Sequence, residues 1–166
     1  MAGVSLDPVE IKQAGNVVVT LIALGFLLAA LAGDQWQKFE SDDDSEKISL
    51  WKHCVANKTV EICQDLKPKP TYVKVTQAFL IIATSHIFLA AIFSILLVCG
   101  KMQAKHAYWP YITTLLSSLI GLAVYSGMAD LQDGWEFGWC FILGWLGFAA
   151  SIAASVRHCI IERSVN

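Results

Sequence analysis

Four long runs of apolar residues, separated by polar segments, dominate the chain. They cover about residues 14–33, 75–100, 109–129 and 138–156. A helix that crosses a bilayer needs about 20 mostly apolar residues, and each run has about that length or more. Asp34 ends the first run and Arg157 ends the fourth, while Pro110 occupies the first turn of the third, where its missing N–H costs nothing. We therefore predict an all-α membrane protein with four transmembrane helices.

Composition supports this prediction. Hydrophobic residues make up 55% of the chain and charged residues 16%, whereas a soluble domain averages about 45–50% and about 25%. The net charge is −2 and the sequence has no basic block, so nothing points to nucleic acid as a partner. Because the apolar runs use roughly half of the chain, we expect residues 1–166 to form one membrane domain.

The first run has one feature of a cleaved signal peptide, since Ala30-Leu31-Ala32 resembles a signal-peptidase site. The segment before the run carries Asp7 and Glu10 against Lys12, which is not the positively charged start that such a peptide needs. We therefore expect the first helix to be retained.

Small residues recur four positions apart in the last two runs. The pairs are Ser117 with Gly121, Gly147 with Ser151, and Ala150 with Ala154. Small residues let helix backbones approach closely in lipid, so we expect them to pack inside the bundle, with a dimer interface as the alternative. Aromatic residues collect at the ends of the runs, where they predict an interfacial belt: Trp36, Tyr72, Tyr108, Trp109, Tyr111, Trp135 and Trp139.

The connections between the runs differ in length and charge. The second, residues 101–106, is short and basic, and the third, residues 130–137, has no Lys or Arg. The first, residues 34–74, is long and carries several lysines, so a count of positive charges alone leaves the orientation open.

Two features of the first connection resolve the orientation. Cys54 and Cys63 lie close enough in the chain to form a disulfide, and Asn57 begins the glycosylation sequon Asn57-Lys58-Thr59 between them. Disulfides and glycans belong to the extracellular or lumenal side. We therefore expect residues 34–74 and 130–137 to be extracellular loops and both termini to be cytoplasmic, in a multi-pass protein of the plasma membrane or of intracellular vesicles.

Alternation of apolar and polar residues predicts strands in the first loop, at residues 47–54 and 59–63. Residues 55–58 between them suit a tight turn, because Asn57 tolerates left-handed backbone angles. The pattern predicts a hairpin locked by Cys54 and Cys63, since a small polar sheet needs such a staple. Closing so short a loop stabilises the fold by about 2–3 kcal/mol.

Several other polar residues have both an ordinary and a functional interpretation. The acidic run at residues 42–46 fits a solvated loop or a cation-attracting patch, and it lacks the Gly and the later Glu of a calcium loop, so no metal site is predicted. His86 fits a hydrogen bond to a neighbouring helix or a functional group inside the membrane. Cys99 and Cys159 near the helix ends fit either palmitoylation or ordinary thiols, and Cys140 fits packing.

The sequence has no HExxH, GxSxG or phosphate-binding glycine loop. The serines inside the runs also lack a His and carboxylate pair within plausible reach. We therefore expect a protein that is not an enzyme and needs no cofactor.

One constellation in the first loop resembles a known family. Trp36, then Leu50-Trp51-x-x-Cys54, then Cys63, is similar to the W–(G)LW-x-x-C–C signature of claudins and of the peripheral myelin protein, epithelial membrane protein and lens fibre membrane protein family. Residues 72–79 and 137–145 resemble that family's starts of the second and fourth helices, and the likeness runs from Val18 onward.

The chain departs from claudins at three places. Ser49 replaces a usual Gly, Gln77 replaces a usual Arg, and the tail Ser164-Val165-Asn166 lacks a hydrophobic last residue. These departures favour the myelin, epithelial and lens branch. The Val-Thr-Gln sequence that ends at Gln77 also resembles the natural killer cell granule type of the same superfamily.

The resemblance implies a left-handed four-helix bundle under a small extracellular antiparallel sheet, with Trp36, Leu50 and Trp51 wedged against the outer membrane face. It implies adhesion or junction organisation through the stapled loop, by self-association or with other membrane proteins in the same or the facing membrane. The alternatives are a regulatory or trafficking subunit of a channel or receptor, and a paracellular pore. The acidic run motivates the pore, but Gln77 and the tail argue against it.

Overall fold

The computed structural model describes residues 8–41, 44–57, 60–100, 108–129, 131 and 134–165. Its helices are α1 (Pro8–Ala32), α2 (Thr71–Val98), α3 (Tyr108–Met128) and α4 (Trp139–Val165). Its strands are β1 (Gln37–Glu40), β2 (Asp44–Ile48), β3 (Lys52–Asn57), β4 (Val60–Asp65) and β5 (Trp135–Phe137). Each helix contains a segment long and apolar enough to cross a membrane, so the chain is an integral multi-pass membrane protein.

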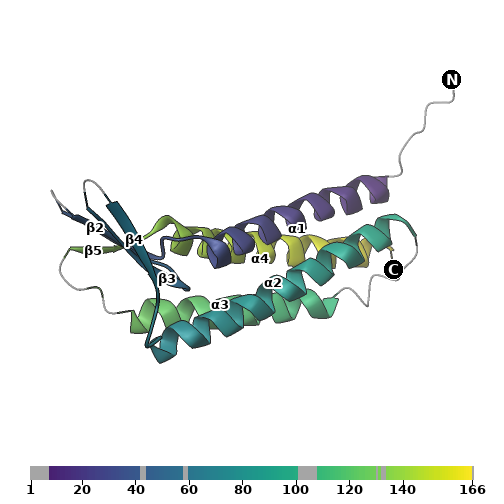
Figure 1. The fold of residues 1–166 in the computed structure, drawn as a ribbon. Coiled ribbons are helices and arrows are strands. Elements are labelled where there is room, and N and C mark those ends of the chain that lie inside the picture. The colour runs from purple at the N-terminus through teal and green to yellow at the C-terminus, as the bar shows by residue number, and fades with distance from the viewer. Residues whose placement is uncertain are drawn as a thin grey trace, which may run out of the picture.

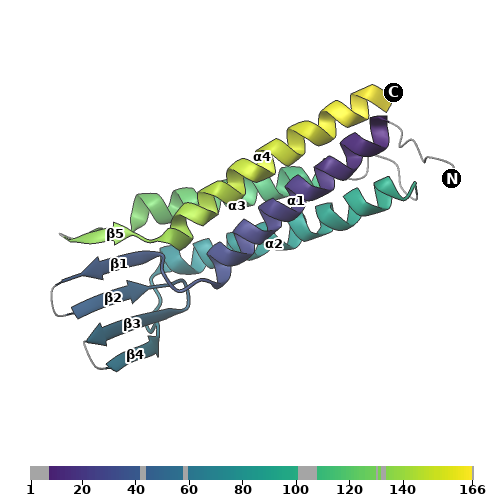
Figure 2. The same ribbon diagram turned by 90° about the horizontal axis from the view of Figure 1, so that it is seen from above.

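The four helices lie side by side, with the sheet at one end of the bundle and both chain ends at the other (Figures 1 and 2). We refer to these as the sheet end and the terminus end. At the terminus end the helices continue past the apolar runs. α1 begins at Pro8 and α4 extends to Val165, with Arg163 in its last turn, where a cation interacts favourably with the helix dipole.

The small residues lie where helices approach most closely. A side chain at Gly121 of α3 would come within 3.3 Å of Phe79 of α2, and Thr76 donates a hydrogen bond of 3.1 Å to the Gly121 carbonyl. A side chain at Gly147 of α4 would come within 2.9 Å of Leu27 of α1. Ser117, Ser151 and Ala154 are buried as well. The prediction that these positions pack inside the bundle is confirmed.

The interfacial aromatic belt was predicted correctly only in part. Trp109 and Trp139 are well exposed at helix ends, as a membrane interface requires. Trp36 and Tyr111, by contrast, are fully buried. Their polar atoms find hydrogen-bond partners inside the protein, and this allows an indole or phenol to leave the interface.

The sheet is fully antiparallel, in the order β4-β3-β2-β1-β5. Its outer strand β5 comes from the connection between α3 and α4, so both connections at the sheet end build one layer. The predicted hairpin is present as β3 and β4, with Cys54 directly opposite Cys63.

The first predicted strand, residues 47–54, is wrong because the chain turns within it. Lys47 and Ile48 end β2, and Lys52 begins β3. The hydroxyl of Ser49 accepts hydrogen bonds from the N–H groups of Trp51 (3.1 Å) and Lys52 (2.8 Å), which closes the turn. A serine at a turn can bond its neighbouring backbone in this way, so local chemistry overrides the alternation.

Gly147 gives a direct test of the α1–α4 contact. We expect Gly147→Leu to lower the free energy of unfolding by about 1–3 kcal/mol, because the added atoms collide with Leu27. Gly25 on α1 has no neighbouring atom within 4 Å of an added side chain, so Gly25→Leu is the matched control. The measurement is thermal unfolding in detergent followed by circular dichroism. Equal losses in the two variants would contradict the packing.

Candidate interaction site

Two tryptophans join the sheet to the end of helix α1. The indole Nε1 of Trp36 donates to the carbonyl of Ala30, and that of Trp51 donates to the carbonyl of Leu31, each at 2.7 Å. These carbonyls belong to the last turn of α1, where no further helical N–H can reach them. The two signature tryptophans therefore act as side-chain caps of this helix.

The two rings have different surroundings. Trp36 is fully buried and lies edge-on to Tyr125 of α3 and Phe141 of α4, with ring centroids 4.6 and 6.0 Å apart. Trp51 keeps 37% of its surface exposed, and the ammonium group of Lys69 lies 5.0 Å from its ring centroid. Trp36 thus closes the end of the bundle, while Trp51 lies at its rim.

Leu50 and Gln77 make the second attachment. Leu50 is fully buried at the turn between β2 and β3. The side-chain amide of Gln77, on the first turns of α2, donates to the Leu50 carbonyl. Gln77 replaces the Arg that is usual in claudins. It therefore still holds the loop by a hydrogen bond, although it carries no positive charge.

Burial revises the predicted wedge of Trp36, Leu50 and Trp51 against the outer membrane face. Trp36 and Leu50 contact the protein interior, and of the three only Trp51 is exposed enough to meet lipid. The sequence predicted that the membrane surrounds these side chains. The ends of the helices surround Trp36 and Leu50 instead.

The start of α4 is bonded to residues 33–36, the segment that connects α1 to β1. The N–H of Gly138 donates to the Trp36 carbonyl (2.8 Å), and the N–H of Gln35 donates to the Cys140 sulfur (3.3 Å). A side chain at Gly33 would collide with that sulfur. Cys140 is fully buried, in agreement with its predicted role in packing.

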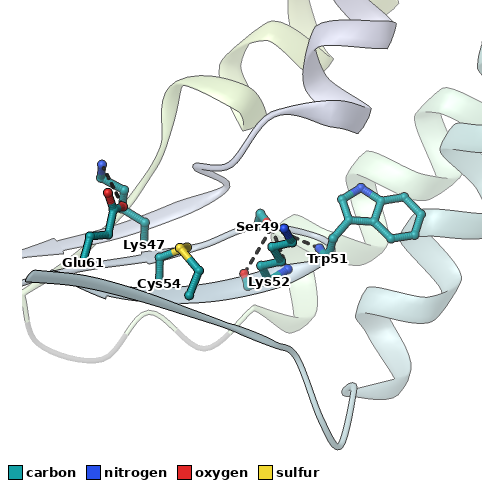
Figure 3. Close-up of a disulfide and its surroundings, with 7 residues drawn as sticks. Lys47, Ser49, Trp51, Lys52, Cys54 and Glu61 are labelled. Atoms are coloured by element: carbon teal, nitrogen blue, oxygen red, sulfur yellow. Dashed lines mark hydrogen bonds and ion pairs between the residues drawn. A yellow bond between two sulfur atoms is a disulfide. The ribbon is translucent and has the colours of Figure 1, made fainter.

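The sheet has one charged face. Directly opposed residues point to the same face of an antiparallel sheet, so one row across the strands reads Cys63, Cys54, Lys47, Lys38 and Glu136. Lys38 pairs with Glu136 at 3.3 Å, and Lys47 pairs with Glu61 at 3.9 Å. Figure 3 shows the second pair on the same side of the sheet as the disulfide.

The other face has one mostly apolar row and also carries Asp44, opposite Asn57. Its outer row reads Ile62, Val55, Glu46, Phe39 and Trp135, and Val60 lies on the same face because it is two residues from Ile62. We call Phe39, Val55, Val60, Ile62 and Trp135 the apolar sheet face. The next row ends in Phe137, whose ring stacks on Phe141 of α4 at 4.1 Å, so this face is the one turned toward the helices.

Part of this face is uncovered. Val60 and Ile62 are each 57% exposed and Val55 is 38% exposed. His53, Val55, Ile62 and Gln64 line a shallow hollow of about 260 Å³ there. β3 and β4 project to one side of the bundle, away from the helices (Figure 2). The single acid in the outer row, Glu46, lies 3.1 Å from the His53 ring.

The remaining predicted residues are distributed as follows. Asn57 ends β3, while Lys58 and Thr59 of its sequon lie outside the described residues, as do Asp42 and Asp43 of the acidic run. Asp44 and Glu46 belong to β2 rather than to a loop. His86 bonds the Ile82 carbonyl of its own helix (2.9 Å), so the predicted bond to a neighbouring helix is wrong.

Three thiols are free among the described residues. Cys99 is exposed just after α2 and Cys159 is partly exposed on α4, whereas Cys140 is buried. Palmitoylation of Cys99 or Cys159 stays a prediction. Cys54 and Cys63 lie near Glu61 in a group of possible metal ligands, but their sulfurs form the disulfide and cannot also bind a metal as thiolates.

Comparison with known proteins agrees with this architecture. The PMP-22/EMP/MP20/Claudin family matches residues 11–156 of the chain. The lens fiber membrane intrinsic proteins of Homo sapiens and Rattus norvegicus are each 22% identical over 155 residues, which cover 87% of this chain and 87% of theirs. That family is one of structural membrane proteins rather than enzymes. The chain belongs to the PMP-22/EMP/MP20/Claudin family.

Proposed function

We propose that this protein organises contacts between cells or membranes by binding a second copy of itself through the apolar sheet face. The observation that carries the proposal is the exposure of Val55, Val60 and Ile62 together on one face of a sheet. Contiguous exposed apolar side chains on a folded layer mark interaction surfaces. Junction or adhesion roles are consistent with the family to which the chain belongs.

Charge favours a second copy as the partner. The outer row of this face contains one acid, Glu46, and His53 lies beside it at hydrogen-bond distance. The exposed stretch formed by Val55, Val60 and Ile62 carries no charge, so two copies that meet there bring no like charges together, whose close approach costs several kcal/mol at an interface. The other acid of this face, Asp44, belongs to β2. On the charged face, by contrast, Lys38 and Lys47 already pair with Glu136 and Glu61 of the same chain.

The way in which the sheet is attached to the helices also supports a role in binding a second copy. The sheet is fixed to α1 by two indole hydrogen bonds and to α2 by Gln77, and the disulfide joins its two projecting strands. A surface held in one geometry loses little conformational entropy when it binds, so more of its contact free energy appears as affinity.

We further propose that the sheet lies outside the cell and both termini in the cytoplasm, in the plasma membrane. The disulfide supports this orientation, because disulfides persist in oxidising compartments. Arg157 and Arg163 lie at the terminus end of α4, and positive charges favour the cytoplasmic side.

Self-recognition is tested in a mixed culture of cells that produce the tagged protein and cells that do not. We expect the signal to concentrate where two producing cells touch. Ile62→Thr should reduce this enrichment, because it replaces an exposed apolar side chain of the apolar sheet face by a polar one that still suits a strand.

The neighbouring Glu61→Thr is the matched control for this test. Glu61 lies on the charged face, and its ion pair with Lys47 is exposed and contributes little to stability, so enrichment should persist. A uniform signal from the wild-type protein would contradict self-recognition. Co-purification of one dominant membrane partner in that case would favour a regulatory subunit instead.

Orientation is tested through the sequon that begins at Asn57. We expect the wild-type protein to lose apparent mass on treatment with an N-glycosidase, because an outward sequon is reached by the glycosylation machinery. Thr59→Ser keeps the sequon and should keep the shift, whereas Thr59→Ala should abolish it. An unshifted wild type, together with antibody access to a C-terminal tag on intact cells, would reverse the proposed orientation.

A further inference from the structure

A polar cluster joins all four helices near the terminus end of the bundle. The hydroxyl of Tyr111 on α3 lies 3.1 Å from the amide nitrogen of Asn16, 2.9 Å from the Thr20 hydroxyl and 2.8 Å from the Ser94 hydroxyl. Asn16 and Thr20 belong to α1 and Ser94 to α2. The ring of His158 on α4 lies against the Tyr111 ring, with centroids 5.2 Å apart. All five side chains are at most 4% exposed.

One polar atom of this cluster lacks a hydrogen-bond partner among the described residues. The side-chain oxygen of Asn16 is buried and has no hydrogen-bond partner among the described residues. Exchanging the amide oxygen and nitrogen would only transfer the deficit to the nitrogen, because the Tyr111 hydroxyl satisfies one of the two atoms. A buried polar atom without a partner costs about 1–3 kcal/mol, so such atoms are usually satisfied by protein or by water.

A small cavity adjoins that atom. Asn16 lines it together with Gln13, Ser94, Leu97, His158 and Ile161. About 10 Å³ of it is open to the centre of a water molecule. Space of roughly 10–15 Å³ on this measure is what one buried water requires.

We propose that this cavity is a hydration site, in which one buried water donates a hydrogen bond to the Asn16 side-chain oxygen. Asn16, Ser94 and His158 place polar groups of three helices around the cavity, and a buried water makes about three hydrogen bonds. The water therefore lies between α1, α2 and α4.

Water fits the site better than a cation. The residues that line the cavity include no carboxylate, so a metal ion would enter low-dielectric surroundings without a compensating charge. A water molecule can donate to the Asn16 oxygen and accept from a hydroxyl or a ring N–H in the same position. The site is independent of the sheet and of the proposed adhesion.

Hydroxyl-radical labelling tests the site in the full-length protein in lipid nanodiscs. X-ray pulses produce radicals from bound water as well as from bulk water, so a buried side chain beside a bound water is oxidised. His158 is 3% exposed and lines the cavity, whereas Tyr125 is 1% exposed and does not. We expect mass spectrometry to show faster oxidation at His158 than at Tyr125. Equal, slow oxidation of both would overturn the proposal.

Two substitutions at Asn16 sharpen the test. Asn16→Leu and Asn16→Ala both remove the hydrogen bond to Tyr111, but leucine fills the cavity and alanine enlarges it. We expect His158 labelling to be lost in Asn16→Leu and kept in Asn16→Ala, because the Tyr111 and Ser94 hydroxyls hold water in the enlarged cavity once the Asn16 side chain is removed. Identical labelling in the two variants would refute a water at this position, and so would wild-type labelling that changes when choline replaces sodium, since that result indicates a cation.

Discussion

The C-terminal turn of α1 presents carbonyl groups that the helix itself cannot satisfy, and the architecture of the sheet end depends on how they are satisfied. Side chains from the sheet supply the donors, Trp36 to Ala30 and Trp51 to Leu31. Trp36 is fully buried, so its bond is costly to lose, because the Ala30 carbonyl would have no water to replace the indole. The bond of Trp51 lies at the exposed rim. Tryptophan suits the task, since its ring fills the apolar end of the bundle while its single N–H reaches the backbone.

This constraint determines which face of the sheet remains uncovered. With Trp36 buried and Phe137 stacked on Phe141, the inner rows of one sheet face lie on the helices. Side chains alternate between faces, so the same face continues outward as Phe39, Val55 and Ile62, beyond the reach of the bundle. The disulfide points to the other face, with the lysines. The rows that contain Phe39, Val55 and Ile62 are therefore the part of this face that the helices leave uncovered.

The sequence predicted the features that single residues or short periods encode. Bilayer length demands long apolar runs, so the four helices were recognisable, and Cys54 and Cys63 identified the hairpin and, with Trp36 and Leu50-Trp51, the family. Features created by distant partners were not recognisable. β5 is only three residues long and pairs with β1 about a hundred residues earlier. Tyr111 resembles an interfacial residue until Asn16, Thr20 and Ser94 are placed around its hydroxyl. The hydroxyl of Ser49 closes a turn within residues 47–54. The alternation of apolar and polar residues carries no information about this hydrogen bonding, so it predicted a strand there.

The two ends of the bundle solve the same problem in different ways. In lipid, apolar contact between helices gives little net drive, so close packing at glycines and satisfied polar groups must determine how the helices sit together. At the sheet end the polar groups are backbone carbonyls, and rigid indoles from outside the bundle satisfy them. At the terminus end they are side chains of the helices themselves, centred on Tyr111. The sheet is attached to α1 through Trp36 and Trp51, to α2 through Gln77 and to α4 through Gly138. The polar cluster lies at the far end of those same helices, where it can hold their spacing without taking part in recognition.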